Sequence, residues 1–317
     1  MTLQEIYEFV VKRGLTRDPR TKKELEEEKK RIRLEYSRLK KEDRVCFDKE
    51  LLIHPYADTR ILNGNRKTKI NTIMVGIDIG GEELLAAYLL NEKGAGIDLA
   101  LSHHPSGRGL ANLSRVMHIH TDVLVHLGID KKIAHSLMKE RIGEVERRLL
   151  PANHERSTDM ARLLGMPFMC VHTPADNHVA HFLQCLFDRK KPKKIKNVLE
   201  MLKTIPEYKD GACKGAGPQL IAGKEDKKPG KIFVDMTGGT EGSKKIFARL
   251  SQAGVSTIVA MHLGEEHFKI AKMEFMNVII AGHIASDNLG MNLVLDELRK
   301  KHTFNIIPCS GFVRVKR

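Results

Sequence analysis

Residues 71–104, NTIMVGIDIGGEELLAAYLLNEKGAGIDLALSHH, decide the fold class of this chain. The apolar run from Thr72 to Ile79 predicts a strand, and the run from Ile97 to His104 predicts another. Between them, GEELLAAYLLNEKG predicts a helix that Gly94 ends. Short apolar runs continue to alternate with helical segments along the chain, which is typical of parallel βαβ units. The sequence therefore predicts an α/β fold with parallel or mixed sheets flanked by helices.

The chain also divides into predicted regions. Its N-terminal part stands out because the run from Thr21 to Asp43 is dense in Glu, Lys and Arg, as in a charged, solvated helix. A basic, proline-containing break at 189–196 marks a candidate domain junction. The predicted regions are a charged helical N-terminal extension or arm at 1–45, a main α/β domain at 46–190 that is completed by 276–317, and a smaller inserted α/β domain at 191–275.

Composition narrows the class of protein. Of the 317 residues, 41% are hydrophobic, which is enough for a real core, while aromatic residues make up only 5% and Trp is absent. Lys and Arg number 54 against 40 acidic residues, a formal charge of +14. Such an excess attracts phosphate-bearing partners, but a generally basic or thermophilic surface would also explain it.

The cysteines and the apolar runs bear on location. The five cysteines form no C-x-x-C pair, and their odd number argues against a disulfide framework. No apolar run approaches the ~18 residues that a membrane helix requires. We therefore expect a soluble, cytoplasmic protein with no membrane segment.

Histidines fall at the ends of four predicted strands. DLALSHH ends on His103 and His104, PFMCVH on His172, STIVAMH on His262, and NVIIAGH on His283. In open parallel sheets, ligands bind in the crevice beyond the carboxyl ends of the strands. One histidine at a strand end is usually a hydrogen-bonded core or loop residue. Four such ends in one chain favour a common site.

Carboxylates follow two of these histidines at short range. Asp176 lies four residues after His172, and Asp287 lies four residues after His283, in the first turn of a helix that we expect to begin near Ser286. Imidazole and carboxylate ligands suit zinc, iron, manganese or nickel. Adjacent histidines diverge at a strand end, so His103 and His104 favour two ions ~3.5–4 Å apart rather than one. The residues predict a dinuclear site of His103, His104, Asp176, His283 and Asp287.

Three other motifs are weaker candidates. HLGEEH (262–267) resembles a reversed zincin helix, but an additional Glu breaks the spacing and Gly264 weakens the helix. DMTGGTEGS (235–243) lies between a strand and a helix, where a loop can hold phosphate; it lacks a GK[ST] ending, so a tight turn is the simpler interpretation. HIHTDVLVHLG (118–128) predicts a helix whose histidines we interpret mainly as surface or packing residues.

IDLALSHHPSGRG, HTPADN and AGHIASDNLG, in this order, resemble the signatures of the Ngg-interacting-factor-three-like family, whose members are also known as homologues of GTP cyclohydrolase I type 2. YADTRILNG with VGIDIGGEELLAAYLL is similar to the start of the family's domain, so the resemblance spans about Leu51 to Phe312. It implies an α/β protein with a middle insertion, a dinuclear metal site, and a ring-like homo-oligomer, often a hexamer.

The resemblance also implies roles for single residues. The family's adjacent metal histidines correspond to His103 and His104, its H-T-x-x-D aspartate to Asp176, and its C-terminal histidine to His283. Asp287 stands where the family has a bridging Glu, one methylene longer. His172 matches a position that orients Asp176.

Three functions remain open at this point. The first is a metal-dependent hydrolase acting on a nucleotide or another small phosphorylated ligand, with two divalent ions (Fe, Zn, Mn or Ni) as cofactors. The second is a metal-binding or metal-delivery protein in metallocofactor assembly that performs no catalysis. The third is a nucleic-acid or protein interaction module that uses the charged arm.

Overall fold

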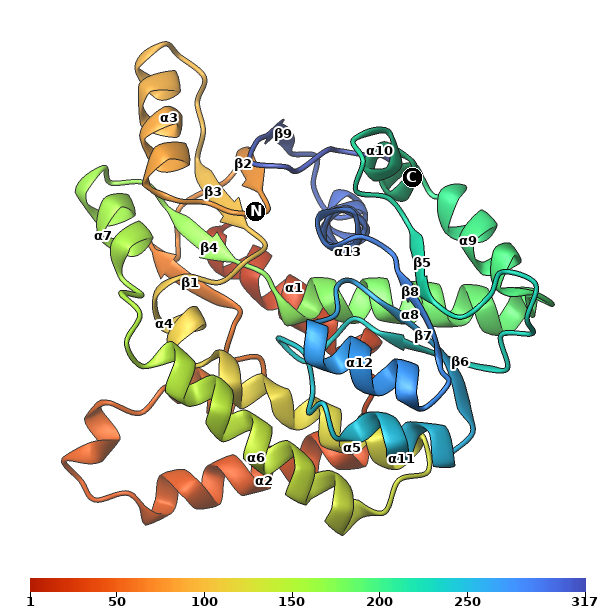
Figure 1. The fold of residues 1–317 in the computed structure, drawn as a ribbon. Coiled ribbons are helices and arrows are strands. Elements are labelled where there is room, and N and C mark those ends of the chain that lie inside the picture. The colour runs from red at the N-terminus through yellow and green to blue at the C-terminus, as the bar shows by residue number, and fades with distance from the viewer.

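Two mixed β-sheets with helices around them make up the molecule, and the computed structural model describes all of residues 1–317 (Figure 1). This architecture confirms the predicted α/β fold class. The strands are β1 (Arg60–Asn63), β2 (Thr72–Gly76), β3 (Leu99–Ser102), β4 (Phe168–Cys170), β5 (Gln219–Ala222), β6 (Lys231–Asp235), β7 (Val255–Ala260), β8 (Asn277–Ile280) and β9 (Asn305–Pro308).

The helices account for most of the remaining chain. The α-helices are α1 (Leu3–Arg17), α2 (Lys22–Arg38), α3 (Gly81–Glu92), α4 (Gly107–Ala111), α5 (His118–His126), α6 (Lys131–Leu149), α7 (Arg156–Leu163), α8 (Thr173–Lys190), α9 (Ile195–Lys203), α10 (Pro206–Cys213), α11 (Ile246–Gln252), α12 (Glu265–Met273) and α13 (His283–Arg299). The 3₁₀-helices are η1 (Asp43–Val45), η2 (Lys49–Leu52) and η3 (Leu113–Met117). No helix is long and apolar enough to cross a bilayer.

Each sheet combines parallel strands with one antiparallel edge strand. The first sheet has the order β1-β4-β3-β2-β9, with β1 antiparallel to β4 and the other pairs parallel. The second has the order β5-β8-β7-β6, with β5 antiparallel to β8. The βαβ units β2-α3-β3, β6-α11-β7 and β7-α12-β8 supply three of the five parallel pairs, as the alternation of strands and helices predicts.

Alternate residues of the first sheet face two separate cores, because successive side chains of a strand point to opposite faces. Ile73 and Val75 pack in a core that also contains residues of α1, α8 and α13. Met74 packs in a smaller core with residues of α3 and α7. Both faces of this sheet are therefore covered, as its parallel strands require.

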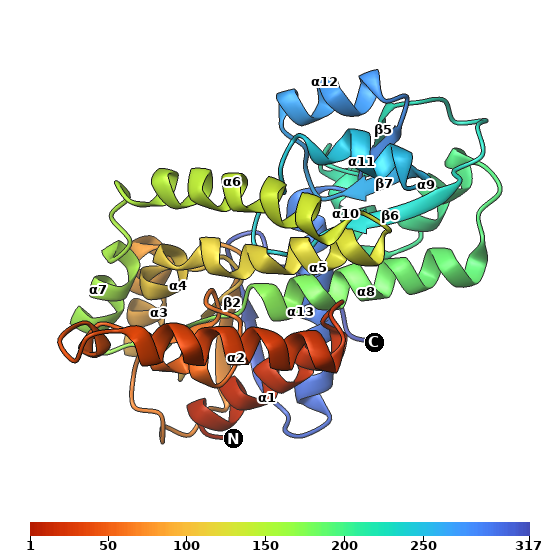
Figure 2. The same cartoon turned by 90° about the horizontal axis from the view of Figure 1, so that it is seen from below.

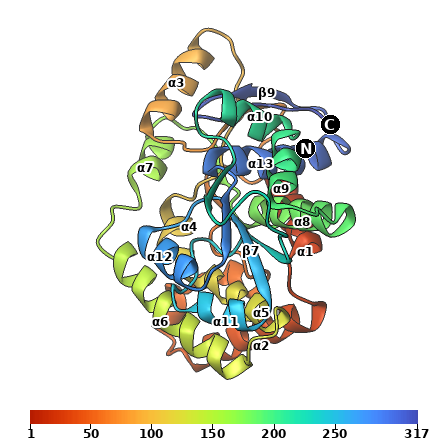
Figure 3. The same cartoon turned by 45° about the vertical axis from the view of Figure 1, so that its right-hand side comes forward.

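The second sheet is also covered on both faces. One face packs on α5, α6, α11 and α12, and the other packs on α8, α9, α10 and α13. Figure 3 shows β7 between these two groups of helices. β8 lies just beyond the predicted end of the inserted domain at residue 275, yet it pairs with β5 and β7. The sheet thus extends past that boundary, while the division into domains stays a prediction.

α8 and α13 connect the two halves. Each leaves the end of one sheet's strand and packs in the cores of both: Ala175 of α8 contacts the first core, while Val179 and Leu183 contact the second sheet. In α13, Leu289 faces the second sheet and Val294 the first. The two helices cross so closely that a Cβ on Gly290 would lie 2.6 Å from the carbonyl oxygen of Ala175. This crossing holds the strand ends of the two sheets together.

The first two helices differ in environment. Figure 2 shows α2 along the outside of the molecule, and Ile32 is its one buried residue, in agreement with the predicted charged helix. α1 instead contributes Leu3, Ile6 and Val10 to the core of the first sheet. The first helix of the predicted N-terminal extension is therefore an integral part of the main body, and only α2 has the character of an arm.

Candidate metal centre

The carboxyl ends of strands from both sheets meet at one cleft. His103 and His104 follow β3, His172 follows β4, and His283 follows β8. The ring centroids of His103 and His172 are 4.8 Å apart, those of His104 and His283 are 5.3 Å apart, and those of His283 and His262, which follows β7, are 4.8 Å apart. The predicted convergence of the four strand ends is confirmed.

The two crossing helices bring the carboxylates to these histidines. Asp176 lies in the first turn of α8 and Asp287 in the second turn of α13. The expectation that α13 begins near Ser286 is wrong: Gly282, with φ of 109°, precedes a helix that begins at His283. His283 and Asp287 therefore lie four residues apart on one helix face, with Nε2 and Oδ2 separated by 3.5 Å.

His103, Asp176 and Asp287 form a buried group that we call the inner triad. The Nε2 atom of His103 lies 3.5 Å from Oδ1 of Asp176 and 3.4 Å from Oδ1 of Asp287. The three side chains are 1%, 7% and 0% exposed. Their potential ligand atoms lie within 4.8 Å of one another, so the three could hold one ion.

His104, His283 and Asp287 form a second group, the outer triad. Oδ2 of Asp287 lies 3.5 Å from Nε2 of His104 and 3.5 Å from Nε2 of His283. The His104 and His283 side chains are 26% and 41% exposed, so solvent reaches this group. Asp287 belongs to both triads and turns one carboxylate oxygen to each. Its shorter side chain still reaches both sets of histidines.

Hydrogen bonds to Nδ1 orient the histidines. The Nδ1 atom of His103 lies 3.0 Å from the carbonyl oxygen of Val171, and that of His104 lies 2.7 Å from Oδ1 of Asp78. An acceptor at Nδ1 places the proton there and leaves Nε2 free to bind a metal ion. Sequence reasoning missed Asp78, because no motif distinguishes it from an ordinary residue after a strand.

His172 has a different arrangement from the one expected. Its Nε2 atom is 3.8 Å from Oδ2 of Asp176, too long for the orienting hydrogen bond that the resemblance implies. Its Nδ1 atom lies 2.9 Å from Oδ2 of Asp58, which also accepts from the Thr173 hydroxyl at 2.6 Å. His172 thus presents Nε2 toward His103 and His104, as a possible further ligand. Asp58, which is fully buried, was also missed by sequence reasoning.

The charges of the two triads are strongly coupled. Burial raises the pKa of Asp176 to about 8, and the nearby Asp287 adds to this effect. Burial acts in the same direction on Asp287, but the facing imidazoles outweigh it and hold the pKa of Asp287 well below its usual value. Burial would lower the pKa of His104, yet Asp287 and Asp78 raise it to about 9. Burial lowers the pKa of His283 to about 4.

Unpaired polar atoms test whether a metal ion fits this site. Nine buried side-chain nitrogen or oxygen atoms in the chain have no hydrogen-bond partner, and four belong to the inner triad: His103 Nε2, Asp176 Oδ1 and both oxygens of Asp287. Buried polar atoms are rarely left unpaired, because losing their hydration costs about 1–3 kcal/mol each. Divalent cations held by the two triads would satisfy all four, so the donor set fits a metal site.

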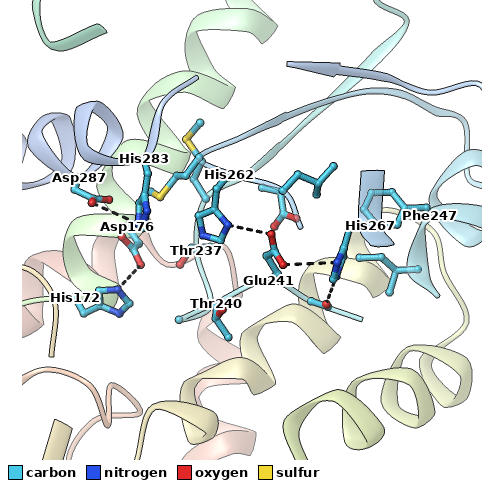
Figure 4. A pocket seen from close by; sticks show the side chains of 17 residues that line it. His172, Asp176, Thr237, Thr240, Glu241, Phe247, His262, His267, His283 and Asp287 are labelled. Atoms are coloured by element: carbon cyan, nitrogen blue, oxygen red, sulfur yellow. Dashed lines mark hydrogen bonds and ion pairs between the residues drawn. The ribbon is translucent and has the colours of Figure 1, made fainter. Parts of the chain in front are cut away.

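The cleft continues from the triads to a group of polar residues on the second sheet (Figure 4). Glu241 lies there between two histidines: its Oε1 is 3.0 Å from Nδ1 of His262, and its Oε2 is 3.6 Å from Nδ1 of His267. Oε1 also accepts from the Gly264 amide at 2.6 Å. The histidines of HLGEEH therefore flank a carboxylate from another loop, which agrees with rejecting a zincin helix.

The chain is similar to several solved structures. No protein-family model and no curated protein matches it. A protein from Sphaerobacter thermophilus, described as a NIF3 superfamily protein, is 28% identical over 80% of this chain and 91% of its own, with a TM-score of 0.69.

Two matches are more distant. Reduced HcgD from Methanocaldococcus jannaschii is 14% identical over 78% of this chain and 86% of its own, with a TM-score of 0.48. A Bacillus cereus protein described as related to NIF3 is 11% identical over 78% of this chain and 90% of its own, with a TM-score of 0.44.

Proposed function

Since this chain belongs to the NIF3 superfamily, the Ngg-interacting-factor-three-like proteins, we propose that it binds two divalent metal ions and acts as a metal-dependent hydrolase on a nucleotide or another phosphorylated substrate. One observation carries the metal site: Asp287 is buried between three imidazoles, with Oδ1 toward His103 and Oδ2 toward His104 and His283. A carboxylate shared in this way is suited to bridge two ions.

The residues have separate tasks in this proposal. The inner triad would hold one ion and the outer triad the other, with Asp287 common to both. Ions held there would supply Lewis acidity toward a phosphoryl oxygen. Val171 and Asp78 bond to Nδ1 of His103 and His104, so that the Nε2 atom of each ring is aimed at the site. The exposed edge of the outer triad would admit the substrate.

The ligand chemistry limits the metal. Nitrogen and carboxylate donors without a cysteine suit iron, zinc, manganese or nickel. Cys170 is a buried thiol that lies close to His172 and Asp176 in the sequence. It contacts the carbonyl oxygen of Asp58 at 3.3 Å and belongs to neither triad.

A metal-delivery protein is the second candidate, and the exposure of the outer triad favours it. His283, 41% exposed, would release an ion more readily than a buried ligand does. Delivery requires a labile ion, whereas hydrolysis requires turnover. The two functions are therefore separable by experiment.

Self-association into a cyclic homo-oligomer is part of the proposal. α3 exposes Leu85, Tyr88 and Leu89, at 41%, 38% and 52%, on consecutive turns of one helix. Clustered exposed apolar side chains are typical of a protein interface. Light scattering after size-exclusion chromatography would give the mass, and Leu89→Lys should lower it if this surface is used.

The test begins with anaerobic metal analysis of the purified protein, followed by phosphate release from GTP and a panel of phosphomonoesters. We expect metal-dependent turnover that His104→Ala abolishes. His126→Ala, a substitution of a surface histidine paired with Glu24, serves as the control and should retain activity. Bound metal without turnover on any substrate, together with rapid loss to a chelator, would favour delivery instead.

A further inference from the structure

The loop from Thr237 to Ser243 joins β6 to α11 and lies across the cleft from the triads. Thr237, Gly239, Thr240, Glu241 and Gly242 line the same pocket as the metal-ligand candidates (Figure 4). The proposed ions and this loop thus face one cavity.

Side chains from three helices hold successive carbonyl groups of the loop. His120 Nε2, on α5, lies 2.9 Å from the carbonyl oxygen of Thr240. Arg141 Nε, on α6, donates to that of Glu241 at 3.0 Å. His267 Nε2, on α12, lies 3.0 Å from that of Gly242. Three consecutive peptide units are therefore anchored by their oxygen atoms, two of them by side chains outside the cleft and one by His267, which lines it.

The amide groups of the same peptide units are unpaired. In a trans peptide the N–H of the next residue points opposite to the C=O, and the chain has no cis peptide. The amides of Glu241, Gly242 and Ser243 therefore point away from the three anchoring side chains. No backbone N–H from Thr237 to Ser243 donates to a backbone carbonyl oxygen. These donors are therefore available to an acceptor from outside the chain.

Close packing fixes the loop in this conformation. Gly238 and Gly239 have φ of 101° and 83°, which residues with a Cβ rarely adopt. A Cβ on Gly238 would lie 2.5 Å from Nε2 of His120, and one on Gly239 would lie 2.6 Å from Cγ2 of Val116. The amides are thus held in place before a ligand arrives, as in the backbone nests that bind anions.

The carboxylates around the loop determine when an anion can bind. Glu241 faces the cleft but is paired with His262 and the Gly264 amide. Asp235 lies at the end of β6 without such a pair, and burial raises its pKa. Asp287, whose pKa is held well below its usual value, would repel an anion unless a cation neutralises it. Anion binding at the loop should therefore require the loaded metal site.

We propose that the Thr237–Ser243 loop binds the phosphoryl group of the substrate through its backbone amides, opposite the metal ions. This assignment rests on the proposed hydrolase function and narrows its substrates to phosphate esters that carry a terminal, dianionic phosphate. The phosphate would lie between the loop amides and the outer triad. His120, Arg141 and His267 act as positioning residues, since they hold the carbonyl groups rather than the ligand.

Calorimetric titration of the metal-loaded protein with inorganic phosphate tests this role, and α6 offers a matched pair of variants. Arg141 and Arg148 both form ion pairs with Glu144, at 2.9 Å and 3.3 Å, but only Arg141 holds the loop. Arg141→Met should weaken phosphate binding about tenfold through disorder of the amides, whereas Arg148→Met should change it less than about twofold.

A second pair of variants guards against misfolding of the Arg141 variant. His267→Ala removes the donor to Gly242 and should weaken phosphate binding, while His267→Gln can place an N–H near the same position and should restore it. Metal content is measured for every variant and should equal that of the unmodified protein. Equal phosphate affinity in Arg141→Met, His267→Ala and Arg148→Met would overturn the loop assignment.

Failure of the hydrolase proposal would give a different result from failure of the loop assignment. If phosphate binding depends on Arg141 but the protein shows no phosphoesterase turnover, the hydrolase proposal is wrong and the loop is still an anion-binding site. If the protein shows turnover but its phosphate affinity does not depend on Arg141 or His267, the hydrolase proposal stands and the loop assignment is wrong. Phosphate binding of equal strength without metal ions would contradict the required neutralisation of Asp287.

Discussion

The inner and outer triads share Asp287, and each takes one of the two adjacent histidines after β3, yet their surroundings differ. The inner triad is closed: its side chains are at most 7% exposed, and a backbone carbonyl holds His103. The outer triad is open, and His104 is held by Asp78, whose side chain is 66% exposed. The difference in exposure predicts that, of two ions sharing Asp287, the inner one would exchange slowly and the outer one rapidly.

The largest expected effect comes from the residue that the triads share. Asp287→Ala removes a ligand from both and should reduce bound metal from two ions per chain nearly to none, as measured by plasma mass spectrometry after desalting. Asp296→Asn changes a carboxylate on the same helix that pairs with Arg314 and should leave the metal content unchanged. An Asp287→Ala protein that keeps one ion would show that a triad survives without the shared carboxylate.

The next effect separates the triads. His103→Ala should leave only the outer ion and His283→Ala only the inner one, so both variants should contain one ion per chain. Because the inner triad is buried, the ion left in His283→Ala should transfer to a chelator about ten times more slowly than the ion left in His103→Ala. Equal transfer rates would remove the distinction between closed and open sites.

The two ions should also differ in how strongly protons compete with them for their ligands. Below pH 8 the Asp176 carboxyl holds a proton that an inner ion must displace, because its pKa is raised to about 8. The affinity of the inner ion should rise about tenfold per pH unit from pH 6 and level off near pH 8. His104, with its pKa raised to about 9, should extend the rise of the outer ion to pH 9. Chelator competition at four pH values measures both slopes, and flat profiles would contradict them.

The smallest expected effect on metal affinity comes from Asp78, which orients the His104 ring. Asp78→Asn weakens the hold on Nδ1 of His104 and should lower the affinity of the outer ion by at most about tenfold, since Asp78 is largely exposed. The inner ion of the same protein is the internal control and should keep its affinity. Loss of both ions in Asp78→Asn would mean that the triads do not bind independently.

Sequence patterns predicted the βαβ units and the convergence at the strand ends, because periodicity and position along a strand are local properties. The antiparallel edge strands β1 and β5 were not predicted, since their partners lie over 50 residues away in sequence. α1 was assigned to the N-terminal extension because of the charged run that follows it. Its apolar spacing, with Ile6, Val10 and Val11 on one face, was the signal for the core.

The candidate site, like the fold, was predictable only where the signal is local in sequence. The histidines and carboxylates near strand ends stood out by type and spacing, whereas Asp58 and Asp78 reach their histidines from strand-end and loop positions more than 20 residues away. The Thr237–Ser243 loop was interpreted as a tight turn. Its role as an anion site depends on contacts from three separate helices, which no local pattern contains.

The place of the first helix has a consequence for biosynthesis. α1 packs against α8 and α13, and β2 pairs with β9 near the other end of the chain. At ribosomal speeds of about 5–20 residues per second, the apolar face of α1 waits roughly 15–60 s before these partners emerge. During that time the second sheet, complete at Ile280, can already fold. The nascent chain should therefore depend on chaperones that cover Leu3, Ile6 and Val10 until its last strand is made.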